Sequence, residues 1–344
     1  MSYDIKPTKI DIPQSEIDHY KEILQLTRLP DEPIISGAEA PGSNYGTRLS
    51  DLKSAREQLL NYDWRKMEAE LNRFDHYTVE IENTQIHLIH QKSSRSDAIP
   101  LLVLHGWPFS ILEYRHVIEP LVNPPQGQQA FHVICPSLPG IFMSSIVPDS
   151  NHSTPDVARI FNTLMVDVLG YKVYAAHGGD FGGINLRQIQ LNHSDTCKLV
   201  HFTIFIAPKP ASFTDEDFAN LPDYDRRTIE ARMRFQGSGS GYLAMQTTEV
   251  ATIGYAVYDG IGMASWMVGK YVTAMKSAKV PDERKAEIFH ELLANILALQ
   301  YTHSNHTSML MYRQSGLKYI MEAWGKQEKR GAPIGVSLFD GEMV

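Results

Sequence analysis

The sequence predicts an α/β protein built on a doubly wound, mostly parallel sheet. Three observations lead to this prediction. Short runs of apolar residues recur after residue 100, and such runs are typical of strands buried on both faces. An amphipathic helix lies between two of these runs, and a glycine-rich turn leads from one of them directly into another helix. Strands that alternate with helices form parallel sheets, whose functional sites gather at the carboxyl ends of the strands. The apolar runs are residues 101–104, 131–135, 172–176 and 199–206.

The first 95 residues predict an irregular N-terminal segment. Helical spacing of apolar residues covers residues 14–27, where Leu29-Pro30 ends the pattern, and residues 50–71. Two β-like runs, residues 77–81 and 86–90, are joined by Glu82-Asn83-Thr84, which predicts a hairpin. We expect this segment to precede a separate α/β core.

The core and a helical insertion follow. A helix over residues 155–169 has proline at its first position and ends at Gly170. Residues 330–344 return to the buried-strand pattern. We therefore expect a core of residues 96–206 and 330–344, with a lid of residues 207–329 over the sheet. The helices predicted in the lid are residues 226–235, 247–258, 263–276 and 282–300.

Composition narrows the function. The chain has 344 residues, and 32 Lys and Arg against 40 Asp and Glu give a net charge of -8. This balance does not favour binding to nucleic acid or to anionic membranes. No run of about 18 apolar residues predicts a membrane span. Cys135 and Cys197 are too few for a disulfide framework and suit a reducing compartment, so we expect a cytoplasmic protein.

A glycine-rich turn carries the sharpest chemical signal. Gly178-Gly179-Asp180-Phe181-Gly182-Gly183 follows the predicted strand and leads into a helix. Small residues two before and two after Asp180 match a nucleophile elbow, whose tight turn leaves no room for side chains there. A plain βα turn with a helix-capping Asp is the alternative. A carboxylate nucleophile attacks saturated carbon and forms an alkyl ester, so the substrate would be a haloalkane or an epoxide.

A second motif, His105-Gly106-Trp107-Pro108, follows the strand of residues 101–104. In such folds this loop supplies one backbone N–H of an oxyanion hole, and the residue after the nucleophile supplies the other. We assign these two groups to Trp107 and Phe181. A plain turn closed by Pro108 is the alternative.

Together these two motifs resemble the epoxide hydrolases of the α/β-hydrolase fold. The N-terminal segment resembles the microsomal type, which includes fungal and juvenile-hormone epoxide hydrolases. Haloalkane dehalogenases share the elbow but lack this segment, and they favour Trp at the position of Phe181. The resemblance implies two lid tyrosines, Tyr242 and Tyr312, that protonate the epoxide oxygen; packing residues are the alternative. The segments that carry the N-terminal resemblance are residues 26–30, 44–47, 62–65 and 70–74.

The chain departs from this family near its end. The family completes its triad with a carboxylate and a histidine that activates water, on loops after two later strands. Here no histidine follows His306, and residues 334–339 match the strand before those units. We therefore expect the C-terminal strands to be missing, through truncation or loss of the hydrolytic half-reaction. His177 is a candidate substitute base, with a structural histidine as the alternative.

The sequence thus predicts an epoxide hydrolase that opens a small apolar epoxide through an ester on Asp180 toward a vicinal diol. One alternative is a truncated or degenerate relative that binds or isomerises an epoxide without hydrolysis. Another is a non-catalytic ligand-binding protein. No cofactor or metal is expected, because no Cys and His residues have ligand spacing. No nucleic acid or membrane partner is expected either, and we expect the exposed edge of the last strand to favour self-association, such as a homodimer.

Overall fold

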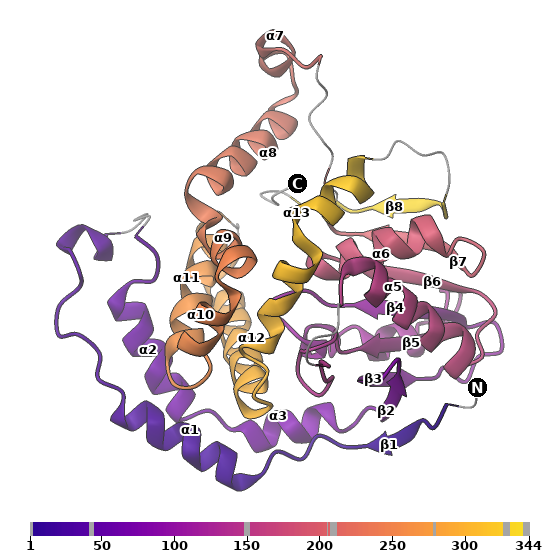
Figure 1. The fold of residues 1–344 in the computed structure, drawn as a ribbon, viewed down its shortest axis with the longest axis horizontal. Coiled ribbons are helices and arrows are strands. Elements are labelled where there is room, and N and C mark those ends of the chain that lie inside the picture. The colour runs from indigo at the N-terminus through magenta and orange to yellow at the C-terminus, as the bar shows by residue number, and fades with distance from the viewer. Residues whose placement is uncertain are drawn as a thin grey trace.

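An eight-stranded sheet forms the centre of the molecule (Figure 1). The structure, a computed structural model, describes residues 3–40, 45–147, 152–204, 206, 212–277, 280–325 and 331–339. The strands are β1 (Lys6–Thr8), β2 (His76–Ile81), β3 (Thr84–Gln91), β4 (Ile99–Leu104), β5 (Phe131–Pro136), β6 (Tyr174–Gly178), β7 (Cys197–Phe202) and β8 (Ile334–Val336). Their order is β1-β2-β3-β5-β4-β6-β7-β8. The pairs from β1 to β5 are antiparallel and those from β5 to β8 are parallel, so the predicted mostly parallel sheet is confirmed.

Burial along the strands follows the prediction only in the middle of the sheet. In β4, the neighbouring residues Leu102 and Val103, which point to opposite faces, are both buried, as expected for a strand covered on both faces. In β7 and β8, by contrast, Leu199 is 48% exposed and Ile334 is 43% exposed. The expectation of burial on both faces is wrong there. Helix α6 (Asp180–Asn192) packs on one face of β6 and β7, and the apolar side chains on the other face reach solvent.

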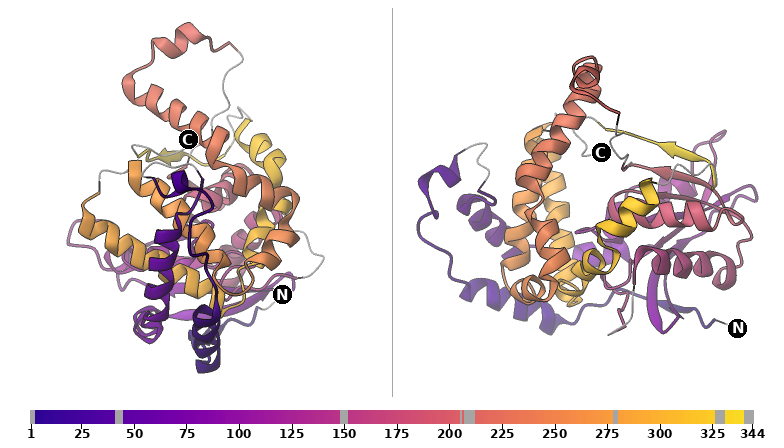
Figure 2. Two further views of the ribbon diagram at one scale, coloured as in Figure 1. Left: turned by 90° about the vertical axis from the view of Figure 1, so that its left-hand side faces the viewer. Right: turned by 45° about the horizontal axis from the view of Figure 1, so that its top comes forward.

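The N-terminal segment wraps around the molecule. Helices α1 (Gln14–Leu26), α2 (Leu49–Leu60) and α3 (Trp64–Leu71) run along the outside of the lid and the sheet (Figures 1 and 2). The predicted single helix over residues 50–71 is wrong, because the Asp63 carboxylate accepts a hydrogen bond from the Lys66 N–H and starts α3 anew. The predicted hairpin is confirmed, with Glu82 and Asn83 at φ of 52° and 60° in its turn.

Arg115 fastens this segment to the rest of the protein. Its side chain is only 6% exposed and forms ion pairs with Glu70 at 3.3 Å and Glu291 at 3.1 Å. Glu70 lies on α3, whereas Glu291 lies on α12 (Asp282–Tyr301) of the lid. The guanidinium of Arg115, a residue that follows the loop after β4, therefore joins the N-terminal segment to the lid.

Helices form the insertion between β7 and β8. A single helix was predicted over residues 247–258, and this prediction is wrong at its start. The structure has two helices there, α9 (Gly241–Thr248), which includes Tyr242, and α10 (Val250–Ala256). A further helix, α13 (Leu310–Gly325), runs from the lid back to the sheet. The other α-helices in the described residues are α4 (Ile118–Val122), α5 (Thr154–Thr163), α7 (Asp215–Ala219), α8 (Asp223–Arg234) and α11 (Gly262–Ser277). Helices α7 and α8 project from the body, and α8 has no buried residue (Figure 1).

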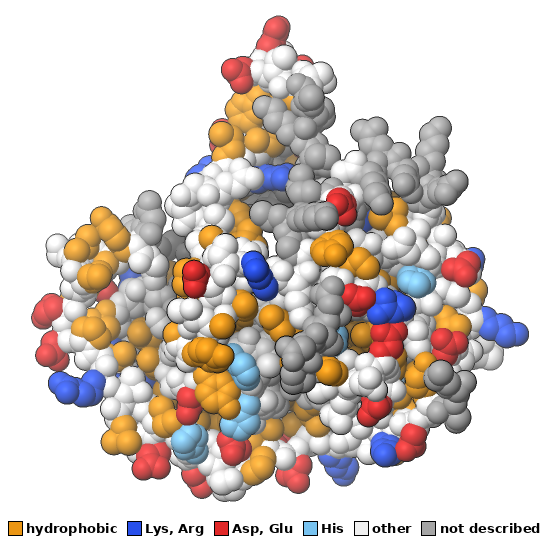
Figure 3. Space-filling view, viewed as in Figure 1, with side chains coloured by type: hydrophobic (Ala, Val, Ile, Leu, Met, Phe, Trp, Pro, Cys, Tyr) orange, Lys and Arg blue, Asp and Glu red, His pale blue; other side chains and the backbone are white. Residues whose placement is uncertain are grey.

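The surface carries charges of both signs. On the face drawn in Figure 3, Lys and Arg side chains are interspersed with Asp and Glu, and no large patch of one sign forms. Among the described residues, no helix combines the length and the apolar character that crossing a bilayer requires. The division into a segment of residues 1–95, a core and a lid stays a prediction.

Candidate active site

Asp180 stands at a sharp turn between β6 and α6. It is the first residue of α6 and has a φ of 45°, which is unusual for a residue other than glycine. The backbones of this turn and of β4 touch, because a β-carbon at Gly182 would lie 2.1 Å from the Leu104 carbonyl oxygen. Only glycine fits at position 182, and the strained turn directs the Asp180 side chain toward the carboxyl end of the sheet.

Two backbone N–H groups point at the Asp180 carboxylate. The Trp107 N–H donates to Asp180 Oδ1 at 2.9 Å, and the Phe181 N–H donates to the same carboxylate. Burial raises the pKa of the carboxyl, and these two hydrogen bonds oppose the rise. The residue is nonetheless exposed, so its carboxylate is surrounded by protein atoms but accessible to water, and we call this region the recess. The structure thus brings together Asp180, Trp107 and Phe181, as the elbow prediction requires.

The loop after β4 is held from both ends. His105 is fully buried, and its Nε2 accepts a hydrogen bond from the Leu138 N–H, so Nδ1 carries the proton and donates to the Gly106 carbonyl. Burial lowers the pKa of His105 to about 4, and the ring is neutral at pH 7. The Trp107 indole N–H donates to Ser308 Oγ at 3.1 Å, and the Trp107–Pro108 peptide is cis. His105 therefore positions the loop rather than reaching Asp180.

Tyr242 and Tyr312 come from two different helices and meet above this loop. Their rings lie 5.9 Å apart, and each lies within 5.6 Å of the Trp107 ring. Each hydroxyl affects the pKa of the other. Burial, with the Asp180 charge as a further cause, raises the pKa of Tyr242 to about 12 and that of Tyr312 well above 10. Both phenols are therefore protonated at pH 7 and lie within the electrostatic field of Asp180.

His177 is engaged elsewhere. Its Nδ1 lies 2.8 Å from His201 Nδ1 on β7, and His201 Nε2 lies 3.0 Å from Ser337 Oγ. Burial, with the neighbouring His201, lowers the pKa of His177 to about 4. Among the described residues, His177 makes no hydrogen bond to Asp180. The structural alternative therefore fits its contacts better than a role as substitute base.

Glu113 is a site residue that sequence reasoning missed. It lies in a short 3-10 helix (Ile111–Tyr114), and its carboxylate accepts a hydrogen bond from the Gly106 N–H. Burial, then the Asp180 charge, raises the pKa of Glu113 to about 8, although the side chain reaches solvent in the same way as Asp180. The one available signal was an acidic residue within the apolar run Ile111-Leu112-Glu113-Tyr114 directly after the oxyanion loop. The recess therefore holds two carboxyls.

Comparison with known proteins gives the family. Residues 5–114 match the family model described as the epoxide hydrolase N terminus, and residues 99–244 match that of the alpha/beta hydrolase fold. A protein of Stigmatella aurantiaca (strain DW4/3-1), named as a predicted epoxide hydrolase, is 30% identical over 98% of this chain and 74% of its own length. The chain belongs to the epoxide hydrolase family. The enzyme class predicted from the sequence, an epoxide hydrolase, is thereby confirmed.

Other relatives agree with this family. Juvenile hormone epoxide hydrolase 1 of Ctenocephalides felis is 28% identical over 99% of this chain and 76% of its own length. The structure of Aspergillus niger epoxide hydrolase superposes with a TM-score of 0.84 at 27% identity, over 99% of this chain and 85% of that one. The predicted α/β-hydrolase fold of this epoxide hydrolase is therefore confirmed. Seven curated relatives that share 28–30% identity are covered over 66–79% of their lengths.

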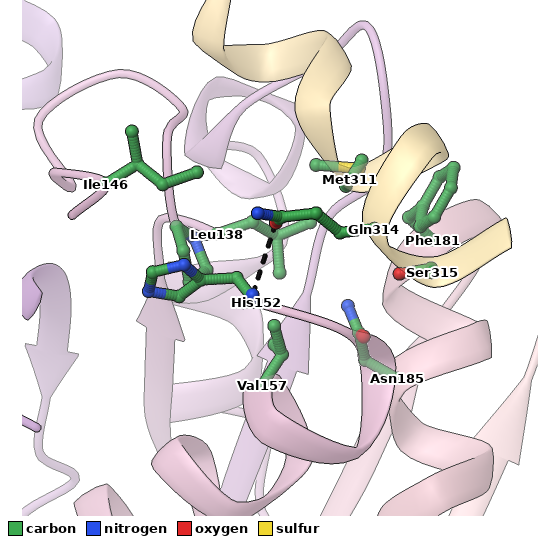
Figure 4. A pocket seen from close by; sticks show the side chains of 10 residues that line it. Leu138, Ile146, His152, Val157, Phe181, Asn185, Met311, Gln314 and Ser315 are labelled. Atoms are coloured by element: carbon green, nitrogen blue, oxygen red, sulfur yellow. Dashed lines mark hydrogen bonds between the residues drawn. The ribbon is translucent and has the colours of Figure 1, made fainter. Parts of the chain in front are cut away.

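Phe181 lines a small cavity in this epoxide hydrolase (Figure 4). Its volume is about 10 Å³, enough for about one water molecule. The His152 N–H donates to Gln314 Oε1 across it at 3.2 Å. The cavity is too small for a substrate. Its lining is Leu138, Pro139, Ile146, His152, Val157, Phe181, Asn185, Met311, Gln314 and Ser315.

No cation site accompanies the recess in the part of the chain that the structure describes. Within those residues, no group of three or more His, Cys, Asp or Glu side chains has an arrangement that could hold a metal ion. The chemistry of this epoxide hydrolase is therefore derived below from its carboxyls, phenols and backbone N–H groups.

Proposed function

We propose that Asp180 attacks a carbon atom of an apolar epoxide and forms an alkyl ester. A new bond joins an Asp180 oxygen to that carbon, the carbon–oxygen bond of the strained ring breaks, and the freed oxygen takes a proton from Tyr242 or Tyr312. The observation that carries this proposal is the position of both phenols beside Trp107, whose N–H binds the Asp180 carboxylate. Aromatic rings around the carboxylate favour an apolar substrate.

The second half-reaction turns the ester into a diol. Water adds to the ester carbonyl carbon, and negative charge develops on the carbonyl oxygen of Asp180. The N–H groups of Trp107 and Phe181 already donate to this carboxylate, so they are arranged to stabilise that charge. The carbon–oxygen bond to the diol then breaks, and Asp180 returns as a carboxylate. A base must take the proton of the attacking water. Glu113 can do so in its ionised form, whereas the contacts of His177 favour a structural role, so Glu113 is the first group to test and His177 the second.

Intact mass spectrometry tests the first half-reaction. The protein is mixed with styrene oxide, a simple aryl epoxide, and quenched in acid at intervals. We expect a mass increase equal to one epoxide in the wild-type protein and none in Asp180→Ala. Tyr242→Phe and Tyr312→Phe should each form the adduct more slowly, because one proton donor is lost. Tyr255→Phe is the matched control, since Tyr255 is 75% exposed and, among the described residues, has no ring contact with Tyr242 or Tyr312.

The fate of the adduct separates the alternatives. Release of diol with steady turnover supports a complete hydrolase, whereas an adduct that persists supports a relative that opens epoxides without hydrolysis. Failure to form an adduct or product with aryl and alkyl epoxides would refute attack by Asp180 and favour a ligand-binding protein.

We also propose a cytoplasmic location and a homodimer. Cys135 and Cys197 are both free and buried, which suits a reducing compartment. The edge strand β8 exposes Ile334 and Val336 to solvent, and such an edge favours pairing with a second copy. Sedimentation velocity at several concentrations tests the dimer, and a monomer at the highest concentration would refute it.

A further inference from the structure

Lys270 contacts the ring of Tyr242. It lies on α11, and its Nζ is 4.4 Å from the centroid of the phenol ring. The same Nζ donates a hydrogen bond to the Gly239 carbonyl at 2.7 Å. Gly239 ends the turn from which α9 starts, three residues before Tyr242. One ammonium group therefore contacts both the ring of the predicted proton donor and the backbone that presents it.

The described residues supply no anionic partner for this ammonium group. Within the part of the chain that the structure describes, no Asp or Glu carboxylate lies within ion-pair distance of Lys270. The side chain is half-buried, and burial lowers the pKa of its ammonium. A buried charge without a counter-charge is unfavourable unless other groups stabilise it. The ring of Tyr242 and the Gly239 carbonyl are those groups here, and a ring attracts a cation through the negative charge density of its face.

A negative charge, that of Asp180, also acts on Tyr242. The Trp107 indole stacks on Tyr242 at 5.6 Å with an interplanar angle of 10°, and the Trp107 N–H binds Asp180. The Asp180 charge adds to burial in raising the pKa of Tyr242. Both effects oppose the loss of its proton. A cation near the ring favours loss of the proton, because a phenolate shares its negative charge with the ring.

We propose that Lys270 is a positioning residue that makes Tyr242 a better proton donor to the opening epoxide. This inference rests on the proposed function. As Asp180 attacks, its charge is neutralised in the ester and negative charge moves to the epoxide oxygen. That oxygen takes the Tyr242 proton, so the charge moves on to the phenol and its ring, where Lys270 stabilises it. A water molecule returns the proton to the phenol before the next turnover.

The first experiment measures the rate of ester formation with styrene oxide under single-turnover conditions. We expect Lys270→Met to slow it roughly 5- to 30-fold, the range that corresponds to loss of a partly desolvated cation–π contact. Lys270→Arg keeps a cation near the ring and should restore most of the rate. Lys53→Met is the matched control, because Lys53 also donates to a backbone carbonyl, that of Asp31, but lies on α2 without a ring contact.

A double-mutant comparison separates chemistry from lid anchoring. Tyr242→Phe keeps the ring and removes the hydroxyl. If Lys270 acts through the phenol, adding Lys270→Met to Tyr242→Phe should slow ester formation no further. Equal slowing in both backgrounds would show that Lys270 only anchors the lid, and would overturn the proposal.

The second experiment needs no epoxide. Fluorotyrosine is incorporated, and the ¹⁹F resonance of position 242 is assigned by its loss in Tyr242→Phe and followed as pH rises. In the wild type we expect the chemical shift of this resonance to change as the Lys270 ammonium loses its proton, at a pH below the one at which Tyr242 ionises. Lys270→Met should abolish this change, and Lys270→Arg should move it to higher pH. If the change is present while the wild-type protein forms no ester, the proposed function fails but the coupling of Lys270 to Tyr242 stands. Absence of the change in the wild type would overturn the coupling, whatever the enzyme does with epoxides.

Discussion

Gly106 is the position where one added methyl group should cost most of the activity. It lies between the buried His105 and Trp107, in the loop that faces Asp180. A β-carbon built on Gly106 would lie 2.4 Å from Asp180 Cβ and 2.6 Å from its Oδ1. We therefore predict that Gly106→Ala displaces the nucleophile.

The geometry sets the size of the effect. An ordinary contact to a β-carbon begins at 3.4 Å, so the Asp180 side chain must move by about 1 Å (3.4 minus 2.4) or the loop must withdraw. Either movement lengthens the 2.9 Å hydrogen bond from the Trp107 N–H to Asp180 Oδ1. A misplacement of about 1 Å can slow a reaction on the order of 100-fold. The strain should also lower the free energy of unfolding by about 1–3 kcal/mol.

The assay is the rate of ester formation on Asp180, measured beside the urea midpoint of each variant. Gly37→Ala is the matched control, because a β-carbon there meets no atom within 4 Å. Its ester formation and urea midpoint should stay near wild type. If Gly106→Ala forms the ester at the wild-type rate while folded, the close approach of this loop to the nucleophile does not control the reaction, and the reasoning is refuted.

Three further predictions concern buried polar groups. Because the folded pKa of Glu113 is raised to about 8 from 4.5, the folded protein keeps a proton that the unfolded chain releases, so stability should fall as pH rises from about 4.5 to 8. Urea midpoints across that range should show this fall reduced in Glu113→Gln, and an unchanged fall would contradict it. Burial lowers the pKa of His87 well below 6.5, so the stability that neutral His87 provides is present above pH 6.5 and is lost as pH falls below it. His87→Gln should therefore lose less stability between pH 7 and 5 than wild type. An equal loss would count against His87 as the source of this pH dependence. Gln246 is fully buried with no partner for either amide atom among the described residues, so Gln246→Met should raise the free energy of unfolding by about 1–3 kcal/mol. A lower value would show that the amide is satisfied, by water or by a bound group.

The elbow could be predicted because its cause is local. Strand, turn and helix adjoin in the sequence, and the small residues at 178 and 182 are required by contacts that every such turn makes. The hairpin at Glu82 and Asn83 is local in the same way. The burial of both faces of β7 and β8 was predicted wrongly. An apolar run shows that a strand can be buried, but it does not show whether helices cover both of its faces.

The residues that were missed depend on contacts between distant segments. Glu113 carries no motif, and it matters because its 3-10 helix folds back onto Gly106 and so into the field of Asp180. Lys270 looks like any lysine of a lid helix, and only the packing of α11 near α9 brings it to the ring of Tyr242. Local patterns identify the strand and turn that present a nucleophile, whereas the groups that adjust its charge come from the tertiary fold.

The two motifs that define the site meet for a reason that the topology makes clear. Residues 107 and 180 are 73 positions apart, yet β4 and β6 are parallel neighbours that pair Leu104 with Gly178. Both chains therefore leave the sheet at the same edge, and an N–H of one loop reaches the carboxylate of the other. The lid then adds phenols from α9 and α13, with a cation behind one of them. In the proposed reaction, negative charge passes from Asp180 to the opening epoxide and on toward Lys270, so the sheet would fix where the reaction starts and the lid would determine where its charge is stabilised.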